Sequence, residues 1–296
     1  MSAYQKINKM ITARLIERIE ATNTLPWKKP WTSVSLMPRN LVTGNNYRGV
    51  NIFLLHMLGY ASPYFLSFKQ VTAMGGKVRK GEKSCPVVFW RIVDAKEDDP
   101  KQKGYAMLRY YRVFNVEQCE GLPESKVPVV EIPTREHTPL EIAEELVANM
   151  PNKPDIGYGR TLASYSPSMD CVSMPSPEWF TSGAEFYGAL FHEICHSVGH
   201  ESRVGRKAIM EPTGFGSHAY SQEELVAEMG SAFLCGYCGI LLCTETNSAA
   251  YLRGWLEKLK SDPSMLIKAG SEAQKAFDYI MDARAAEQQA ELQQAA

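Results

Sequence analysis

The sequence predicts an α+β protein of two domains, on the strength of its size, its charge distribution and one proline-rich segment. With 296 residues and 45% hydrophobic content, the chain is long enough for about two ordinary hydrophobic cores. Residues 1–93 carry 14 Lys and Arg against three acids, a net charge of +11, whereas the rest of the chain carries −12. Residues 121–137 are rich in proline and charge, which is typical of a linker. We therefore expect a basic α+β domain at 1–120 and a mostly helical domain at 138–296.

The composition also bounds where the protein works. No apolar run reaches the length of about 18 residues that a membrane span needs, and the N-terminus has an amphipathic pattern without a signal peptide. Seven cysteines at irregular spacing fit a reducing compartment better than a disulfide framework. We expect a cytoplasmic protein with no membrane partner, and the pattern leaves its oligomeric state open.

Local patterns place the elements of the first domain. A helix is expected over about 3–21, where apolar residues recur at helical spacing. A polar, turn-rich loop at 40–51 leads into an apolar helix at 52–58. Strands are expected at 85–93 and 105–117, which are rich in β-branched and aromatic residues, with the polar segment 94–100 as a hairpin loop between them.

The positive charge of the first domain indicates a polyanionic partner. Two tryptophans and two lysines lie together in Pro26-Trp-Lys-Lys-Pro-Trp31, which suits bases stacking on rings while ammonium groups meet phosphates; burial of the rings in a core is an equal alternative. The stretch 75–83 combines cations with glycines that would let a phosphate chain approach. The candidate DNA-binding residues are Trp27, Lys28, Lys29, Trp31, Arg48, Lys69, Lys77, Arg79, Lys80 and Lys83.

The most specific motif of the second domain is His192-Glu-Ile-Cys-His196, a match to H-E-x-x-H. On a helix, residues four apart share a face, so both imidazoles can bind one Zn²⁺ while Glu193 lies beside it as a general base. A capping box at Ser182-x-x-Glu185 and an apolar stripe along 186–198 predict that helix. Chance spacing of two histidines is the alternative, and the agreement of cap, stripe and motif argues against it.

A catalytic zinc site needs a third protein ligand. The metzincin pattern fails because Ser202 stands where its third histidine would be. Downstream, Ser221-x-x-Glu224 predicts a capping box, which already gives Glu224 a role at the helix start. Glu228 lies one turn further in, in an apolar run where a buried carboxylate needs a partner. We therefore predict Glu228 as the third ligand and Glu224 as a carboxylate that orients a ligand. Zn²⁺ is the expected ion, although another divalent metal fits the same donors.

Other cysteines and histidines compete for this role. Cys235-x-x-Cys238, with Cys243 following, can bind structural zinc, but the pair lies in an apolar helix and lacks a clear second pair, so core cysteines are the favoured interpretation. His200 follows the predicted helix end, and His218 is a further candidate. Two short strands within 163–175 precede the motif. They could present an edge to an extended peptide or pair with each other as an internal hairpin.

Motifs in both halves resemble those of one family. They are Trp27-Lys-Lys-Pro-Trp31, Thr43-Gly44, Tyr47-Arg-Gly-Val-Asn51, Val113-Phe-Asn-Val116, Tyr165-x-Pro-x-x-Asp170, Met174-Pro175, the H-E-x-x-H segment and Glu224-Leu-Val-Ala-Glu228. Together they resemble ArdC-type antirestriction proteins, which join a single-stranded-DNA-binding domain to a zincin-like domain of the gluzincin type. The first half is also similar to the front of conjugative plasmid primases.

The resemblance implies a plasmid-borne antirestriction protein that binds single-stranded DNA and protects incoming DNA from restriction endonucleases. Carried over by residue, His192, His196 and Glu228 would bind the metal and Glu193 would be the catalytic acid/base. Three alternatives stay open. The protein could only coat DNA, with a structural or vestigial metal site. It could cut a restriction enzyme or an unrelated peptide substrate, or it could be a primase accessory fragment.

Overall fold

The structure is a computed structural model, and it describes the chain in several stretches. They are residues 1–27, 37–93, 105–129, 139–211, 214, 217–240 and 249–294. These residues form two compact units. Unit 1 consists of the described parts of Met1–Thr22, Leu36–Ile132 and Trp255–Leu266, and unit 2 of the described parts of Asn23–Ser35, Pro133–Gly254 and Ile267–Ala296. No helix in the described stretches is both long and apolar enough to span a membrane.

Unit 1 is built on a four-stranded sheet of order β1-β2-β5-β4. Its strands are β1 (Arg39–Asn40), β2 (Tyr64–Ser67), β4 (Cys85–Val93) and β5 (Tyr105–Asn115). Strands β1 and β2 are parallel, and the other neighbours are antiparallel. Strands β3 (Lys77–Val78) and β6 (Cys119–Glu120) form a separate antiparallel pair. The expected strand pair is confirmed, and the loop expected between its strands lies outside the described residues.

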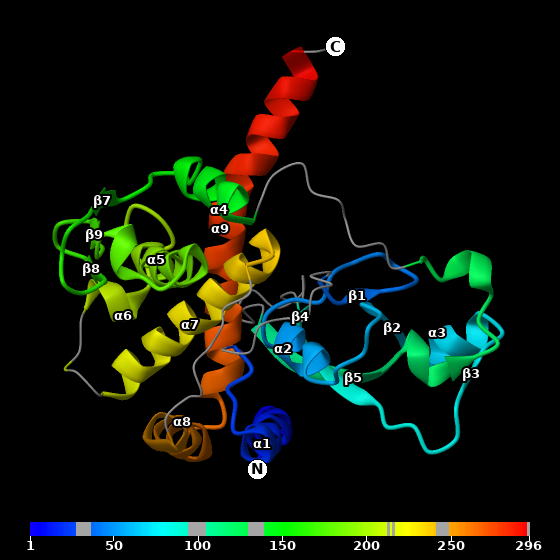
Figure 1. The fold of residues 1–296 in the computed structure, drawn as a ribbon. Coiled ribbons are helices and arrows are strands. Elements are labelled where there is room, and N and C mark those ends of the chain that lie inside the picture. Colours follow the sequence, from blue (N-terminus) through cyan, green and yellow to red (C-terminus); the bar gives the residue numbers. More distant parts are fainter. Residues whose placement is uncertain are drawn as a thin grey trace, which may run out of the picture. The chain divides into compact units, whose positions relative to one another are not determined.

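Three helices of the first half cover this sheet (Figure 1). They are α1 (Ala3–Thr22), α2 (Val50–His56) and α3 (Phe68–Ala73). The expected α1 is confirmed, because its apolar side chains Ile7, Ile11, Leu15 and Ile19 are all buried. The expected helix after the turn-rich loop begins at Val50, two residues earlier than its predicted start.

Residues from the end of the chain also belong to unit 1. The Thr12 hydroxyl donates to the carbonyl of Pro263 at 2.8 Å, and Lys260 pairs with Glu20 at 2.9 Å. Helices α8 (Ala249–Ser261) and α9 (Met265–Gln294) therefore contribute residues to both units. The sequence places all of 138–296 in one domain, whereas residues 255–266 pack with the first half.

Unit 2 is mostly helical, with one small sheet. Its helices begin with α4 (Pro139–Ala148), α5 (Gly183–Ser197), α6 (Lys207–Met210) and α7 (His218–Cys238). The sheet has the order β7-β9-β8, from strands β7 (Asp155–Gly157), β8 (Ser164–Ser166) and β9 (Cys171–Ser173). Strands β8 and β9 are the expected short strands, and they pair antiparallel with β8 at the edge. Helix α5 packs against α7 on one side and against β8 and β9 on another, around a core that includes Phe191, Ile194 and Val172.

Candidate metal centre

The helix that carries the H-E-x-x-H motif begins and ends near the predicted residues. Ser182 is the N-cap of α5, and its hydroxyl accepts from the Glu185 backbone N–H at 3.2 Å. The Glu185 carboxylate accepts from the Thr181 N–H, rather than from Ser182 as a full capping box would require. Gly199 follows the helix end, where an added Cβ would lie 2.5 Å from Ile209 Cγ1. Close packing therefore explains this glycine.

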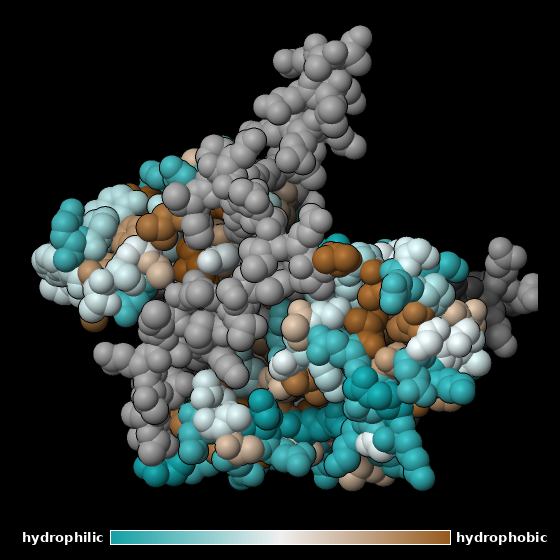
Figure 2. All heavy atoms as spheres, turned by 45° about the vertical axis from the view of Figure 1, so that its right-hand side comes forward, coloured by the Kyte–Doolittle hydropathy of each residue, from teal (hydrophilic) through white to brown (hydrophobic). Residues whose placement is uncertain are grey.

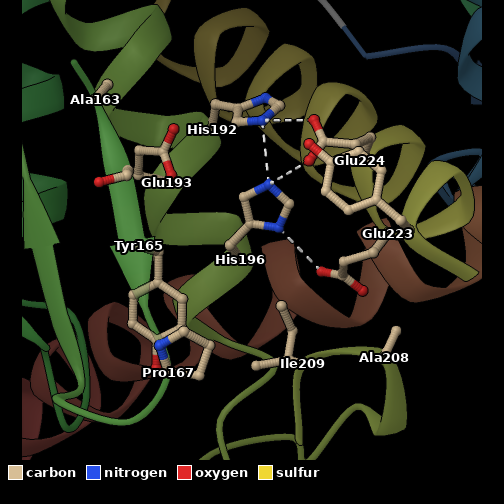
Figure 3. A pocket seen from close by; sticks show the side chains of 12 residues that line it. Ala163, Tyr165, Pro167, His192, Glu193, His196, Ala208, Ile209, Glu223 and Glu224 are labelled. Atoms are coloured by element: carbon tan, nitrogen blue, oxygen red, sulfur yellow. Dashed lines mark hydrogen bonds and ion pairs between the residues drawn. The ribbon is translucent and has the colours of Figure 1, made fainter. Parts of the chain in front are cut away.

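Two imidazoles and one carboxylate converge beside this helix. The Nε2 atoms of His192 and His196 are 3.2 Å apart, and their ring planes are inclined by 79°. Glu224 Oε2 lies 3.5 Å from His192 Nε2, and its Oε1 lies 3.6 Å from His196 Nε2 (Figure 3). Ligands at about 2.0–2.2 Å from a tetrahedral Zn²⁺ are themselves about 3.3–3.6 Å apart. The three side chains therefore have the spacing of a divalent-metal site. Among the described residues, they form the one group of His, Cys, Asp or Glu side chains whose ligand atoms are close enough to hold a metal ion.

The structure brings Glu224 to the two imidazoles, whereas the sequence predicted Glu228 for this position. The prediction depended on a helix that starts at Ser221, which would leave Glu224 as a capping residue. Helix α7 instead starts one turn earlier: Ser217 is its N-cap and accepts from the Tyr220 N–H at 3.2 Å, while Ser221 is buried within the helix. Glu224 is then a full turn inside α7 and free to face α5, so the capping box at Ser221 was wrong.

Glu228 lies close enough to act on the same site electrostatically. The residue is 8% exposed. It does not belong to the group formed by His192, His196 and Glu224, whose ligand atoms lie within 4.8 Å of one another. Burial by itself lowers the pKa of His192, but a hydrogen bond with Glu224 and the negative charges of Glu228 and Glu193 outweigh it and raise that pKa. The surroundings of His192 thus favour a positive charge, as a cation-binding site requires.

A buried ion pair orients the second imidazole. His196 Nδ1 lies 3.2 Å from Glu223 Oε1, and Arg206 holds the same carboxylate through Nε at 3.0 Å and Nη2 at 2.6 Å. Burial raises the pKa of Glu223, but its bonds to His196 and Arg206 outweigh this and lower it. The sequence reasoning missed both partners. The adjacent Glu223 and Glu224 could have indicated this arrangement. Neighbouring residues on a helix point about 100° apart, so their carboxylates can contact two different imidazoles.

Small residues let α5 and α7 approach closely enough to form the site. A Cβ added to Gly230 would lie 2.5 Å from Cys195 Sγ, so only glycine fits without movement. The neighbouring Ser231 donates to the Gly188 carbonyl at 2.9 Å, which ties the two helices together. This close approach, one to two turns from Glu224, sets the distance between its carboxylate and the imidazoles.

The convergent side chains line a cleft of about 420 Å³. Glu193 lies in it on the β8 side of the imidazoles, opposite Glu224 in the view of Figure 3. Tyr220 also lines the cleft, and burial together with the Glu224 carboxylate raises the pKa of its phenol to about 12. Residues Ala163, Ser164 and Tyr165 form the wall on the β8 side. The cleft thus offers a candidate base, a protonated hydroxyl and a strand edge around one metal site.

A second ion pair fixes the β8–β9 hairpin against the end of α5. Arg203 binds both Asp170 oxygens, at 2.8 and 2.9 Å, and also donates to the Ser197 carbonyl at 3.0 Å. The Tyr165 hydroxyl donates to Asp170 at 2.8 Å. Asp170 has a φ of 46°, in the left-handed region that Asp adopts more readily than most L-residues. The wall of the cleft is therefore rigidly attached to the motif helix.

The competing metal ligands lie elsewhere. Cys235 and Cys238 are buried in the hydrophobic core, in agreement with the favoured interpretation, and the cysteines within the described residues are free thiols. His200 Nδ1 is 2.9 Å from Ser202 Oγ, beyond the end of α5. His218 is the exposed first residue of α7. Cys243 lies outside the described residues.

The candidate DNA-binding residues differ in their exposure. Trp27 is 2% exposed, so its ring belongs to a core and is inaccessible to a base in this conformation. Lys28, Lys29 and Trp31 lie outside the described residues. The exposed ones are Arg48, Lys69, Lys77, Arg79, Lys80 and Lys83.

The glycines of the 75–83 stretch have structural explanations. Gly75 and Gly81 have φ of 83° and 91°, in the left-handed region that favours glycine. A Cβ on Gly76 would lie 2.7 Å from a Leu122 methyl carbon. Arg79 is engaged by Glu82 at 3.0 Å. These glycines are therefore explained by backbone conformation and packing, and their presence does not by itself indicate a phosphate-binding loop. The exposed lysines of this stretch stay candidate DNA-binding residues.

The fold and the candidate site are those of a zincin-like metallopeptidase domain joined to a second domain, and comparison of the sequence with known protein families finds the same class. Residues 141–272 match the family of zincin-like metallopeptidases, and His192, His196 and Glu224 lie within this range. Residues 5–114 match the N-terminal domain of the anti-restriction factor ArdC.

Matches to relatives extend across both halves of the chain. Crystal structures of the antirestriction protein ArdC from plasmid R388, metal-free and Mn(II)-bound, are 34% identical with a TM-score of 0.72, covering 96% of this chain and 98% of theirs. The uncharacterized protein y4eC of Sinorhizobium fredii is 32% identical over 93% of this chain and 91% of its own length. The chain therefore belongs to the ArdC antirestriction family. It is also 32% and 31% identical to two DNA primases TraC of Escherichia coli, but spans only 27% and 20% of their lengths.

Proposed function

We propose that this protein is a plasmid antirestriction protein that binds single-stranded DNA with unit 1 and carries a zinc-dependent peptidase site in unit 2. The convergence of His192, His196 and Glu224 beside Glu193 in an open cleft is the observation that supports the peptidase part most strongly. The net charge of +11 over residues 1–93 supports the DNA-binding part.

Two histidines and one glutamate leave a fourth position free for water or substrate, which is the donor set of a catalytic zinc site. The Mn(II)-bound relative supports a divalent ion at such a site. When bound, Zn²⁺ polarises a carbonyl and makes a neighbouring water more acidic. Glu223 and Arg206 keep the His196 ring in position, so little reorganisation is needed when the ion enters.

The other side chains of the cleft have roles in peptide hydrolysis. Glu193 accepts a proton from the attacking water and passes it to the leaving amine. Tyr220 keeps its proton at neutral pH because its pKa is raised to about 12, so it can donate to the developing oxyanion. Strand β8 lies at the sheet edge on the cleft wall, where an extended peptide can add as a further strand. This arrangement favours an unfolded or loop segment as substrate.

The Glu193→Gln variant tests the peptidase site. It keeps the shape and hydrogen-bonding capacity of the side chain but cannot act as a base, so hydrolysis of a casein or peptide-library substrate should fall below detection while Zn²⁺ content stays equal to wild type. Undiminished hydrolysis would exclude Glu193 from catalysis. Hydrolysis and Zn²⁺ content lost together would mean that Glu193 has a structural role at the metal.

The concentration of positive charge in the first half favours a second candidate function, in which antirestriction comes from DNA coating alone. In that case the Glu193→Gln variant protects transformed or conjugated DNA from restriction as well as wild type does. Loss of protection at unchanged DNA affinity would instead make the peptidase activity essential. One protection assay, run beside the hydrolysis assay, separates the two.

A further inference from the structure

Strands β4 and β5 project beyond the rest of the sheet in unit 1. Strand β2 pairs with β5 only at Val113–Asn115, whereas β4 pairs with β5 along the whole length from Val113 to Tyr105. Over most of its length, this pair is therefore a two-stranded ribbon. Side chains alternate between its two faces along each strand. Each face includes buried residues, such as Val87 on one and Val88 on the other, beside the exposed ones considered next.

One face of the ribbon combines aromatic rings with guanidinium groups. Phe89 lies opposite Arg109, and Arg91 lies opposite Met107, so these side chains share a face with Tyr111. The rings of Phe89 and Tyr111 are 5.7 Å apart at an angle of 64°, and they are 42% and 39% exposed. Two large rings in a fixed pair, with so much surface open to solvent, form a platform on which flat groups can stack.

The charge on this face is positive and available. Neither β4 nor β5 contains an Asp or Glu. Arg91 and Arg109 are exposed, and no carboxylate of the described residues pairs with them. Unpaired guanidinium groups beside exposed rings fit a partner that offers both phosphates and planar bases. A protein partner would gain from the rings but would need carboxylates for the arginines.

The opposite face of the ribbon also exposes rings, because Trp90 and Tyr110 are 40% and 43% exposed, but one of these rings and the guanidinium near them already have contacts within the unit. Its Trp90 ring lies 6.2 Å from Tyr4 of α1, and its Arg112 donates to the Ser84 hydroxyl at 3.2 Å. On the first face, Tyr111 likewise borders a buried residue of the unit, Tyr47, whose hydroxyl interacts with it. The exposed Arg48, a candidate DNA-binding residue, follows Tyr47 in the chain. Figure 2, in which unit 1 comes forward, shows hydrophobic side chains exposed among hydrophilic ones on this unit.

We propose that Phe89 and Tyr111, flanked by Arg91 and Arg109, form the surface on which bases of single-stranded DNA stack. This rests on the proposed DNA-binding function and assigns its aromatic contacts to the β4–β5 ribbon instead of the buried Trp27. Stacking on these rings does not depend on sequence, because every base presents a π-face, while the arginines neutralise successive phosphates. Duplex DNA keeps its bases stacked inside and gains only the contacts with the arginines.

The test is fluorescence anisotropy with a labelled oligothymidylate of about 15 nucleotides, a length within the range one such domain covers. The variant Phe89→Leu/Tyr111→Leu removes the rings but keeps apolar bulk, and it should bind about tenfold or more weakly with an unchanged salt slope. The variant Arg91→Gln/Arg109→Gln should lower the slope of log K against log salt by about 1.4, which is two phosphates at about 0.7 each.

Two matched controls make the result specific. Phe89→Tyr/Tyr111→Phe keeps both rings and should bind within about threefold of wild type, as should the opposite-face variant Trp90→Leu/Tyr110→Leu. Equal Zn²⁺ uptake and circular dichroism across the variants show that both units are folded. If the opposite-face variant loses as much affinity, or the Phe89/Tyr111 variant loses none while wild type binds, this surface is wrong and the DNA-binding function stands. If wild type itself does not bind, both proposals fail.

Discussion

In unit 2 the candidate site is concentrated: two histidines one helical turn apart and one glutamate from the facing helix lie within 4.8 Å of one another. In unit 1 the candidate residues belong to the β4–β5 ribbon, to helix α3 and to the segments around Arg48 and 77–83, and their cationic side chains are exposed. Metal chemistry requires donors at fixed distances, whereas a polyanion can be held by many weak contacts along its length. Single substitutions should therefore have large effects in unit 2 and small ones in unit 1.

The largest effect should separate Glu224 from Glu228. Glu224→Ala removes a donor, so Zn²⁺ affinity measured by competition with a chelator should fall by more than the roughly 10- to 100-fold that the loss of a supporting residue causes. Glu228→Ala should stay within that range, because its carboxylate acts on His192 through charge. The reverse order would restore the ligand set predicted from the sequence.

The next effect concerns Glu223, which supports a ligand without being one. Glu223→Gln should weaken Zn²⁺ binding by roughly 10- to 100-fold, because the carboxylate no longer orients His196. It should also destabilise the metal-free protein, since Arg206 is left buried with its charge uncompensated. Removal of Zn²⁺ by a chelator isolates this second effect.

The same carboxylate gives the stability a defined pH dependence. The pKa of Glu223 is lowered below its ordinary value of 4.5, so its charge stabilises the fold above about pH 4.5, and this contribution is lost as the pH falls through the folded-state pKa. Thermal melting of the metal-free proteins should show wild type above Glu223→Gln at pH 7 and the two converging in acid. A constant difference from pH 7 to pH 3 would mean that the carboxylate charge does not contribute.

A smaller effect should come from Gly230, where α5 and α7 approach most closely. Gly230→Ala places a methyl group 2.5 Å from Cys195 Sγ, and overpacking of this kind costs about 1–3 kcal/mol. The helices must separate, so Zn²⁺ affinity should fall as well. Adding Cys195→Ala makes room for the methyl group and should recover part of both losses. Strictly additive effects of the two substitutions would show that this contact does not set the helix spacing.

The smallest effects should be in unit 1. Lys77→Ala or Lys80→Ala alone should weaken oligothymidylate binding by less than about threefold near physiological salt, with a decrease in salt slope of at most about 0.7. Anisotropy titrations at several salt concentrations provide both numbers. A tenfold or larger loss of oligothymidylate affinity from one lysine substitution would contradict this contrast between the units, because it would show that unit 1 also has a concentrated binding site.

Periodic patterns of sufficient length were predictable from the sequence. The helices α1 and α5 and the strand pair β4–β5 agree with expectation, because each repeats a helical or strand period or ends at a recognisable cap. The short hairpin β8–β9 was predicted from the turn-forming residues between its strands. Strand β7 and helix α6 were missed, since three and four residues are too few to show a period. The packing of residues 255–266 into unit 1 depends on contacts such as Thr12 with Pro263, which no local pattern records.

The error at the third ligand has a single physical origin. Ser217 and Ser221 are both good N-cap residues one turn apart, and the residues that follow each favour a helix. Choosing Ser221 shifted the helix start by four residues and assigned Glu224 to the cap, which left Glu228 as the buried carboxylate. In the folded protein the helix begins after Ser217. The two histidines were therefore predicted correctly as a pair, whereas the carboxylate that faces them was assigned one helical turn too far along the chain.

The most direct test of the metal centre is a crystal structure of this protein soaked with Zn²⁺ and measured at the zinc absorption edge. An anomalous peak at about 2.0–2.2 Å from both Nε2 atoms of His192 and His196 and from a Glu224 oxygen is the predicted result. A peak coordinated by Glu228 in place of Glu224, or one at Cys235 and Cys238 with none between the histidines, would contradict the assignment.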